Sequence, residues 1–76
     1  MKELIEYIAK SLVDDPASVK VNEVEGTTSL ILELTVAPED MGRVIGRGGR
    51  VANAMRTLLR VVAAKQGKRA GLEIIE

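Results

Sequence analysis

The sequence predicts a two-layer α+β domain in which three helices cover one face of a three-stranded mixed sheet. Three observations lead to this prediction. Apolar residues recur with helical spacing in 2–13 and 50–66, they alternate as in a strand in 29–36, and the 76 residues suffice for only one thin core. We expect one domain over residues 1–76, with the order helix, strand, strand, helix, glycine loop, helix, strand.

Composition excludes several classes of site. The chain has no cysteine and no histidine, so disulfides, a structural zinc site and the commonest general base are absent. Its apolar runs are far shorter than the ~20 residues of a membrane span, and glutamates stand where the apolar part of a signal peptide would begin. We therefore expect a cytoplasmic protein that needs no metal and no cofactor.

The first helix is expected over residues 2–13. Its apolar residues follow one stripe: Leu4, Ile5, Ile8, Ala9 and Leu12. The helix should stop at Asp14-Asp15-Pro16, because proline disfavours helical geometry in the residue before it. Tyr7 is the only aromatic residue, and we expect it to pack at the edge of the core rather than to stack on a base.

Two strands should follow and form an antiparallel hairpin. Val19, Val21 and Val24 indicate the first strand, and the alternation of leucines in 29–36 indicates the second. Residues 25–28 read as the tight turn between them. Ile31 falls on the outer face of the second strand, where it marks either a partner surface or an ordinary exposed residue.

The second half of the chain predicts a helix pair and a last strand. Pro38 suits the first position of a short helix that ends at Ile45. A long helix should run from Arg50 to about Gln66, close at Gly67, and bury one stripe formed by Val51, Met55, Leu58 and Val62. Residues 68–71 are expected to turn, and 72–75 to form a strand parallel to the second strand.

The loop between the two helices is predicted to bind an anion. Gly46 can adopt the left-handed conformation that closes a helix, and Gly48 and Gly49 leave the backbone bare where the next helix begins. The unpaired N–H groups and the positive end of the helix dipole favour a phosphate there. Three arginines surround the loop: Arg43, Arg47 and Arg50. No acidic residue lies between positions 40 and 73.

Charge is divided unevenly along the chain, although the net charge is zero. Residues 1–40 carry three lysines and nine acidic residues, whereas residues 41–76 carry eight basic and two acidic residues. Such a polarised molecule can attract a polyanion to one side.

The stretch 44–51 reads Val-Ile-Gly-Arg-Gly-Gly-Arg-Val and resembles the Ile-Gly-x-x-Gly signature of KH domains. The helix-first order of elements is similar to the prokaryotic type II arrangement. The length, together with Arg-Val-Ala-x-Ala-Met-Arg-Thr after the glycines, resembles the small bacterial KhpA family over essentially the whole chain.

This resemblance implies binding of single-stranded RNA, with about four nucleotides held and the backbone against the loop. The implied RNA-binding residues are Gly46, Arg47, Gly48, Gly49, Arg43, Arg50, Ile45 and Val51, followed by Asn53, Arg56 and Arg60. The family is also associated with a larger KH partner of the Jag type, KhpB, with RNA chaperoning and post-transcriptional regulation, and with cell length and peptidoglycan homeostasis. Gly48 departs from the usual polar residue, which removes one contact and adds flexibility.

Alternative interpretations stay open. The glycines could serve only a tight turn between packed helices, and Arg56 and Arg60 could form a solvated helix face. The domain could also act chiefly as a protein-interaction module, as a homodimer or with a larger partner. Catalysis is not expected, because the serines have no activating base and the residues after Gly49 do not continue a nucleotide-binding phosphate loop.

Overall fold

The computed structural model describes residues 1–75 and confirms the predicted order of elements. The helices are α1 (Lys2–Leu12), α2 (Met41–Ile45) and α3 (Arg50–Lys65), and the strands are β1 (Lys20–Glu25), β2 (Ser29–Thr35) and β3 (Arg69–Ile75). Three short 3-10 turns, η1 (Pro16–Ser18), η2 (Pro38–Asp40) and η3 (Arg47–Gly49), connect them. None of the helices in residues 1–75 has the length and apolar character needed to span a bilayer.

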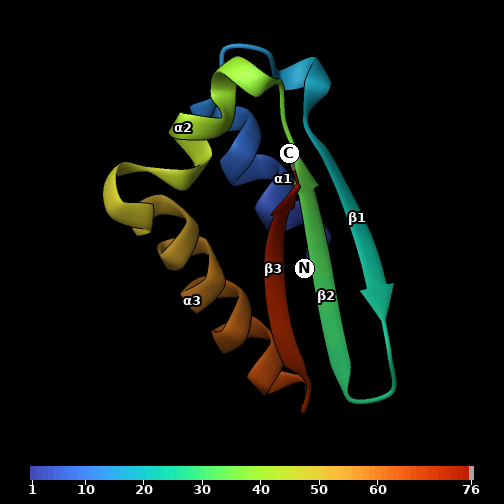
Figure 1. Cartoon of the computed structure of the whole chain (residues 1–76). Coiled ribbons are helices and arrows are strands. Elements are labelled where there is room, and N and C mark those ends of the chain that lie inside the picture. Colours follow the sequence, from blue (N-terminus) through green and yellow to red (C-terminus); the bar gives the residue numbers. More distant parts are fainter. Residues whose placement is uncertain (76) are drawn as a thin grey trace.

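The strands form one mixed sheet in the order β1-β2-β3. The hairpin β1–β2 is antiparallel, and its turn closes with a hydrogen bond of 2.8 Å from the Gly26 amide to the Ser29 carbonyl. The strand β3 runs parallel to β2, so the helix pair forms a crossover between them. Figure 1 shows the helices on one side of the sheet, with α3 beside β3. The mixed two-layer architecture is therefore confirmed.

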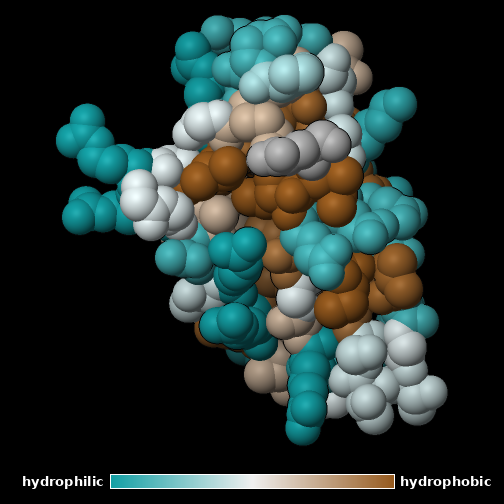
Figure 2. All heavy atoms as spheres, viewed as in Figure 1, coloured by the Kyte–Doolittle hydropathy of each residue, from teal (hydrophilic) through white to brown (hydrophobic). Residues whose placement is uncertain are grey.

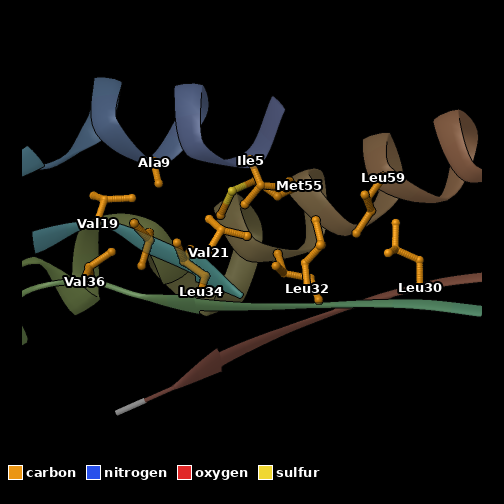
Figure 3. Close-up of a cluster of buried hydrophobic side chains, with 12 residues drawn as sticks. Ile5, Ala9, Val19, Val21, Leu30, Leu32, Leu34, Val36, Met55 and Leu59 are labelled. Atoms are coloured by element: carbon orange, nitrogen blue, oxygen red, sulfur yellow. The ribbon is translucent and has the colours of Figure 1, made fainter. Parts of the chain in front are cut away.

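The core lies between the sheet and the helices. The alternation in β2 is confirmed, because Leu30, Leu32 and Leu34 are almost fully buried. Figure 3 shows Leu32 and Leu34 on the side of β2 that faces Ile5 of α1 and Met55 of α3, and Leu30 pointing toward Leu59 of α3. The core thus holds α1 and α3 against the same strand, and the start of α3 fixes where the glycine loop ends.

The buried stripe of α3 differs from the predicted one. The structure buries Ala52, Met55, Leu59 and Ala63, whereas Leu58 remains 49% exposed and Val51 and Val62 are only half-buried. The sequence is apolar on more than one side of this helix, so periodicity alone allowed two stripes. The buried stripe has a small alanine at each end, Ala52 and Ala63, with Met55 and Leu59 between them.

Two predictions about α1 are also wrong. The helix ends at Leu12 rather than Val13, and Leu12 is 36% exposed rather than part of the buried stripe. Tyr7 is 72% exposed and does not pack at the edge of the core. Only Ile5 and Ala9 of this helix are buried, and both positions face the sheet.

The last strand is longer than predicted. Arg69, Ala70 and Gly71 belong to β3 rather than to a turn, and the Arg69 amide donates to the Thr28 carbonyl over 2.9 Å. Gly71 lies beside Ile31 on the outer face, where an added Cβ would stand 3.1 Å from the Ile31 methyl group. Ile31 is therefore half-buried over a glycine rather than fully exposed. The turn lies earlier and closes at Gly67, as predicted for the end of the helix.

Candidate phosphate-binding loop between α2 and α3

The loop turns sharply at Gly46, where α2 ends. The Gly46 amide donates to the Gly42 carbonyl over 2.9 Å, and the residue has φ 77° and ψ 172°. This φ is positive, as predicted, but the ψ lies outside the left-handed helical region. A Cβ at this position would stand 2.5 Å from a methyl group of Val51 and 2.8 Å from its amide nitrogen. The close approach of Val51 therefore requires glycine here.

Gly48 and Gly49 present bare backbone at the start of α3. Both have positive φ, 65° and 81°, and Gly49 adopts the left-handed conformation as the N-cap residue. An added Cβ at Gly48 would meet nothing within 4 Å. No side chain caps α3, so the amides of its first turn lack a side-chain acceptor. The predicted lack of covering side chains at the start of the helix is thus observed, but the Gly49 and Arg50 amides are not unpaired, because they donate to the carbonyls of Gly46 and Arg47.

Arg47 and Arg50 flank this bare backbone. Both are exposed, and within residues 1–75 neither forms a salt bridge or a side-chain hydrogen bond. Figure 2 shows hydrophilic side chains extending from the molecule at the level of this loop. The loop therefore combines a backbone without covering side chains with two available guanidinium groups, an arrangement that suits an anion.

Arg43, unlike Arg47 and Arg50, is paired with acidic side chains. Its Nη2 atom lies 2.9 Å from a carboxylate oxygen of Asp14, and its Nε atom lies 3.4 Å from Oδ1 of Asp40. The stretch without acidic residues after position 40 did not reveal this pairing, because Asp14 follows α1 and is distant from Arg43 in the sequence. Arg43 is therefore held by Asp14 and Asp40, whereas Arg47 and Arg50 face solvent.

Asp40 is the buried charge that organises this region, and the sequence analysis missed it. Its carboxylate is 1% exposed and accepts hydrogen bonds of 3.1 Å from the backbone amides of Asp14 and Asp15. Together with Arg43, these amides compensate the buried charge. The contact fastens the segment after α1 to the start of α2. No local pattern marks it, because the partners lie 25 and 26 residues away.

Asn53 and Arg56 continue from the loop along α3. An added Cβ at Gly49 would stand 3.8 Å from the Asn53 amide nitrogen, so this side chain lies next to the loop. Arg56 donates from Nη1 to the Asn53 Oδ1 over 3.1 Å and from Nε to the Leu72 carbonyl of β3 over 3.2 Å. Arg60 is exposed and has no such partner within residues 1–75.

The aliphatic members of the predicted site lie on both sides of the glycines. Ile45 and Val51 are half-buried, and Val51 packs under Gly46. Figure 2 shows an apolar area on the surface between the loop and the C-terminal end of β3. Aliphatic surface therefore adjoins the cationic loop, while the side chains of Arg43 and Arg56 are already held by other residues.

The chain is similar to known proteins over nearly its whole length. The family model described as the KhpA/KhpB KH domain matches residues 2–74. The chain is 60% identical over 75 residues to the RNA-binding protein KhpA of Clostridium perfringens, covering 99% of this chain and 100% of that protein. It is 55% identical over 74 residues to the protein of that name from Borreliella burgdorferi, covering 97% and 90%, and 46% identical over 76 residues to the one from Aquifex aeolicus, covering 100% and 96%. No solved structure gives a significant match. The chain therefore belongs to the KhpA/KhpB family of KH domains.

Proposed function

We propose that this protein binds single-stranded RNA and holds the sugar-phosphate backbone at the loop Gly46-Arg47-Gly48-Gly49. The observation that carries the proposal is the bare, positive-φ backbone of Gly48 and Gly49 at the start of α3, flanked by the exposed Arg47 and Arg50. The relatives named RNA-binding protein KhpA, which align over nearly their full length, support the same function.

The phosphates and the bases of the RNA bind to different parts of the loop. Phosphate oxygens accept hydrogen bonds from the amides at the first turn of α3, and Arg47 and Arg50 add charge-assisted contacts. The bases contact the half-buried aliphatic side chains of Ile45 and Val51. Stacking on aromatic rings contributes little, because Tyr7 is the only ring and lies on α1. Arg43 acts mainly through Asp40, by fixing α2.

The decisive test reverses the charge of the loop. The double variant Arg47→Asp with Gly48→Asp should lose at least 95% of its binding to a fluorescein-labelled single-stranded heptanucleotide in fluorescence anisotropy, while its circular dichroism spectrum stays native. The matched control combines Lys2→Asp with Thr27→Asp, which changes the net charge equally but lies away from the loop. Equal losses in both variants, or native binding by the loop variant, would refute the proposal.

The wider role follows from the family resemblance. We infer that the protein is cytoplasmic, acts as an RNA chaperone or post-transcriptional regulator together with a KhpB partner of the Jag type, and contributes to cell-length and peptidoglycan homeostasis. Membership of the KhpA/KhpB family supports this inference. Co-purification of the partner with a tagged native chain, compared with the loop variant, tests whether the partnership depends on RNA.

A second candidate function is protein interaction, and the exposed apolar residues of α3 favour it. Leu58 is 49% exposed and Val61 is 52% exposed, and they lie one helical turn apart. This pair, rather than the half-buried Ile31, offers the apolar surface for a homodimer. Sedimentation at micromolar concentration should then show a dimer for the native chain and a monomer for Leu58→Glu with Val61→Glu, with RNA binding by each monomer retained.

A further inference from the structure

A continuous line of polar groups leads from the glycine loop to β3. The Asn53 amide nitrogen lies beside Gly49, the Asn53 Oδ1 accepts from Arg56 Nη1 over 3.1 Å, and Arg56 Nε donates to the Leu72 carbonyl over 3.2 Å. The first half of α3 and the strand β3, 16 residues apart in sequence, are thus joined through one guanidinium group. A nucleotide chain that leaves the loop toward β3 passes this group.

Arg56 retains unused hydrogen-bond donors in this position. A guanidinium group carries five N–H donors in a rigid plane and no acceptor. Two of them are engaged by Asn53 and Leu72, so three have no acceptor within residues 1–75. The two engaged donors fix the plane of the group, and the residue is only half-buried. Arg56 therefore presents a pre-oriented set of donors to a ligand at low entropic cost.

The backbone beside Arg56 is the free edge of the sheet. The strand β3 pairs with β2 alone in the sheet of the described residues, so its other edge has no strand partner. Arg56 covers this edge only at the Leu72 carbonyl. A purely structural role, protection of the edge against pairing with another strand, would use one donor and leave the others in water.

We propose that Arg56 selects the base that reaches it at the surface where α3 meets the free edge of β3, favouring cytosine and guanine over uracil and adenine; this rests on the RNA binding proposed above. A fork of donors needs two adjacent acceptors, which cytosine offers at O2 and N3 and guanine at O6 and N7. Uracil and adenine place an N–H donor next to each polar acceptor on these edges, so one guanidinium N–H would face another donor. Asn53 is the positioning residue, because it holds one Nη1 hydrogen of Arg56.

The test compares bases that differ only on the edge that Arg56 would contact. Fluorescence anisotropy is measured with heptacytidine against heptauridine, and with alternating guanine–uracil against alternating adenine–uracil heptamers. The native chain should prefer the first member of at least one pair by about tenfold, since a bidentate pair is worth about 1–3 kcal/mol. Arg56→Lys keeps the charge and removes the fork, so this preference should fall below twofold while the dependence on salt stays the same.

Two controls separate this proposal from others. Arg69→Lys, on an exposed arginine at the start of β3, should keep the base preference. In the native chain, the Arg56 Nε–H resonance should shift on titration with the preferred heptamer and not with the other member of the pair, a measurement that does not depend on a folded variant. Equal binding of all four heptamers, or a preference that survives in Arg56→Lys, would overturn base selection and leave RNA binding intact. Failure of the native chain to bind any heptamer would overturn both.

Discussion

The carboxylate of Asp40 lies 3.4 Å from the Nε atom of Arg43, and the two side chains differ sharply in exposure, 1% against 52%. A buried carboxylate is costly unless it is paired and hydrogen-bonded. Here the guanidinium group and two backbone amides, those of Asp14 and Asp15, provide the compensation. The contact therefore secures the end of α1 to the helix that enters the glycine loop.

Replacement of Asp40 should destabilise the whole domain. In Asp40→Ala the amides of Asp14 and Asp15 lose their acceptor and Arg43 loses one of its two acidic partners, so we expect the free energy of unfolding to fall by about 3 kcal/mol. Urea denaturation followed by circular dichroism measures this. The neighbouring and exposed Glu39→Gln should change it by less than about 0.5 kcal/mol. Similar values for both variants would mean that the buried carboxylate contributes little.

Alanine should be tolerated very differently within the loop. At Gly46 the new Cβ would overlap both the side chain and the backbone of Val51, so Gly46→Ala should lower the free energy of unfolding by about 3 kcal/mol or more. Gly48 has open space and only the strain of a positive φ, about 1–2 kcal/mol. Thermal unfolding of the two variants compares them, and a larger loss at Gly48 would contradict the geometry of the loop.

Alanine at Gly42 should have the opposite effect. This glycine lies in α2, has an ordinary backbone conformation, and an added Cβ meets nothing within 4 Å. Alanine loses less conformational entropy than glycine in a helix, so Gly42→Ala should raise the free energy of unfolding by about 0.5–1 kcal/mol. The same unfolding experiment measures it. Destabilisation would indicate that α2 must bend or open at this point.

The salt dependence of RNA binding should report the number of phosphate contacts. With about three phosphates neutralised, a plot of log K against log salt should have a slope near −2. Arg47→Gln should reduce the magnitude of this slope by about 0.7, because one phosphate contact is lost. Arg43→Gln should leave the slope nearly unchanged, since this side chain is already paired with Asp14 and Asp40. A slope that does not respond to Arg47 would exclude it from the phosphate contacts.

Local patterns in the sequence were sufficient to predict the order of elements and the glycine loop. The alternation of β2 and the break at Gly46 each depend on neighbours a few residues away, and both are confirmed. The predicted stripe of α3 was wrong because Leu58 and Leu59 are equally apolar, and only the tertiary structure shows that Leu59 is buried and Leu58 exposed.

The rest of the site depends on contacts between distant segments. The sequence alone does not distinguish Arg43 from Arg47 and Arg50. Only the fold shows that Asp14 and Asp40 pair with Arg43. In the same way, the hydrogen bond from Arg56 to the Leu72 carbonyl joins positions 16 residues apart and leaves no periodic signal. Side-chain pairing of this kind requires knowledge of the tertiary arrangement.

The parallel pairing of β2 with β3 has a consequence for the synthesis of this protein. Ser29 aligns with Arg69, so β2 must wait for both helices of the crossover and for β3 to emerge from the ribosome before its second edge is covered. Until then, an apolar strand with one unpaired edge is exposed to other nascent chains. The sheet is therefore completed only after β3 has been made, and until then the second edge of β2 is open to pairing with another chain.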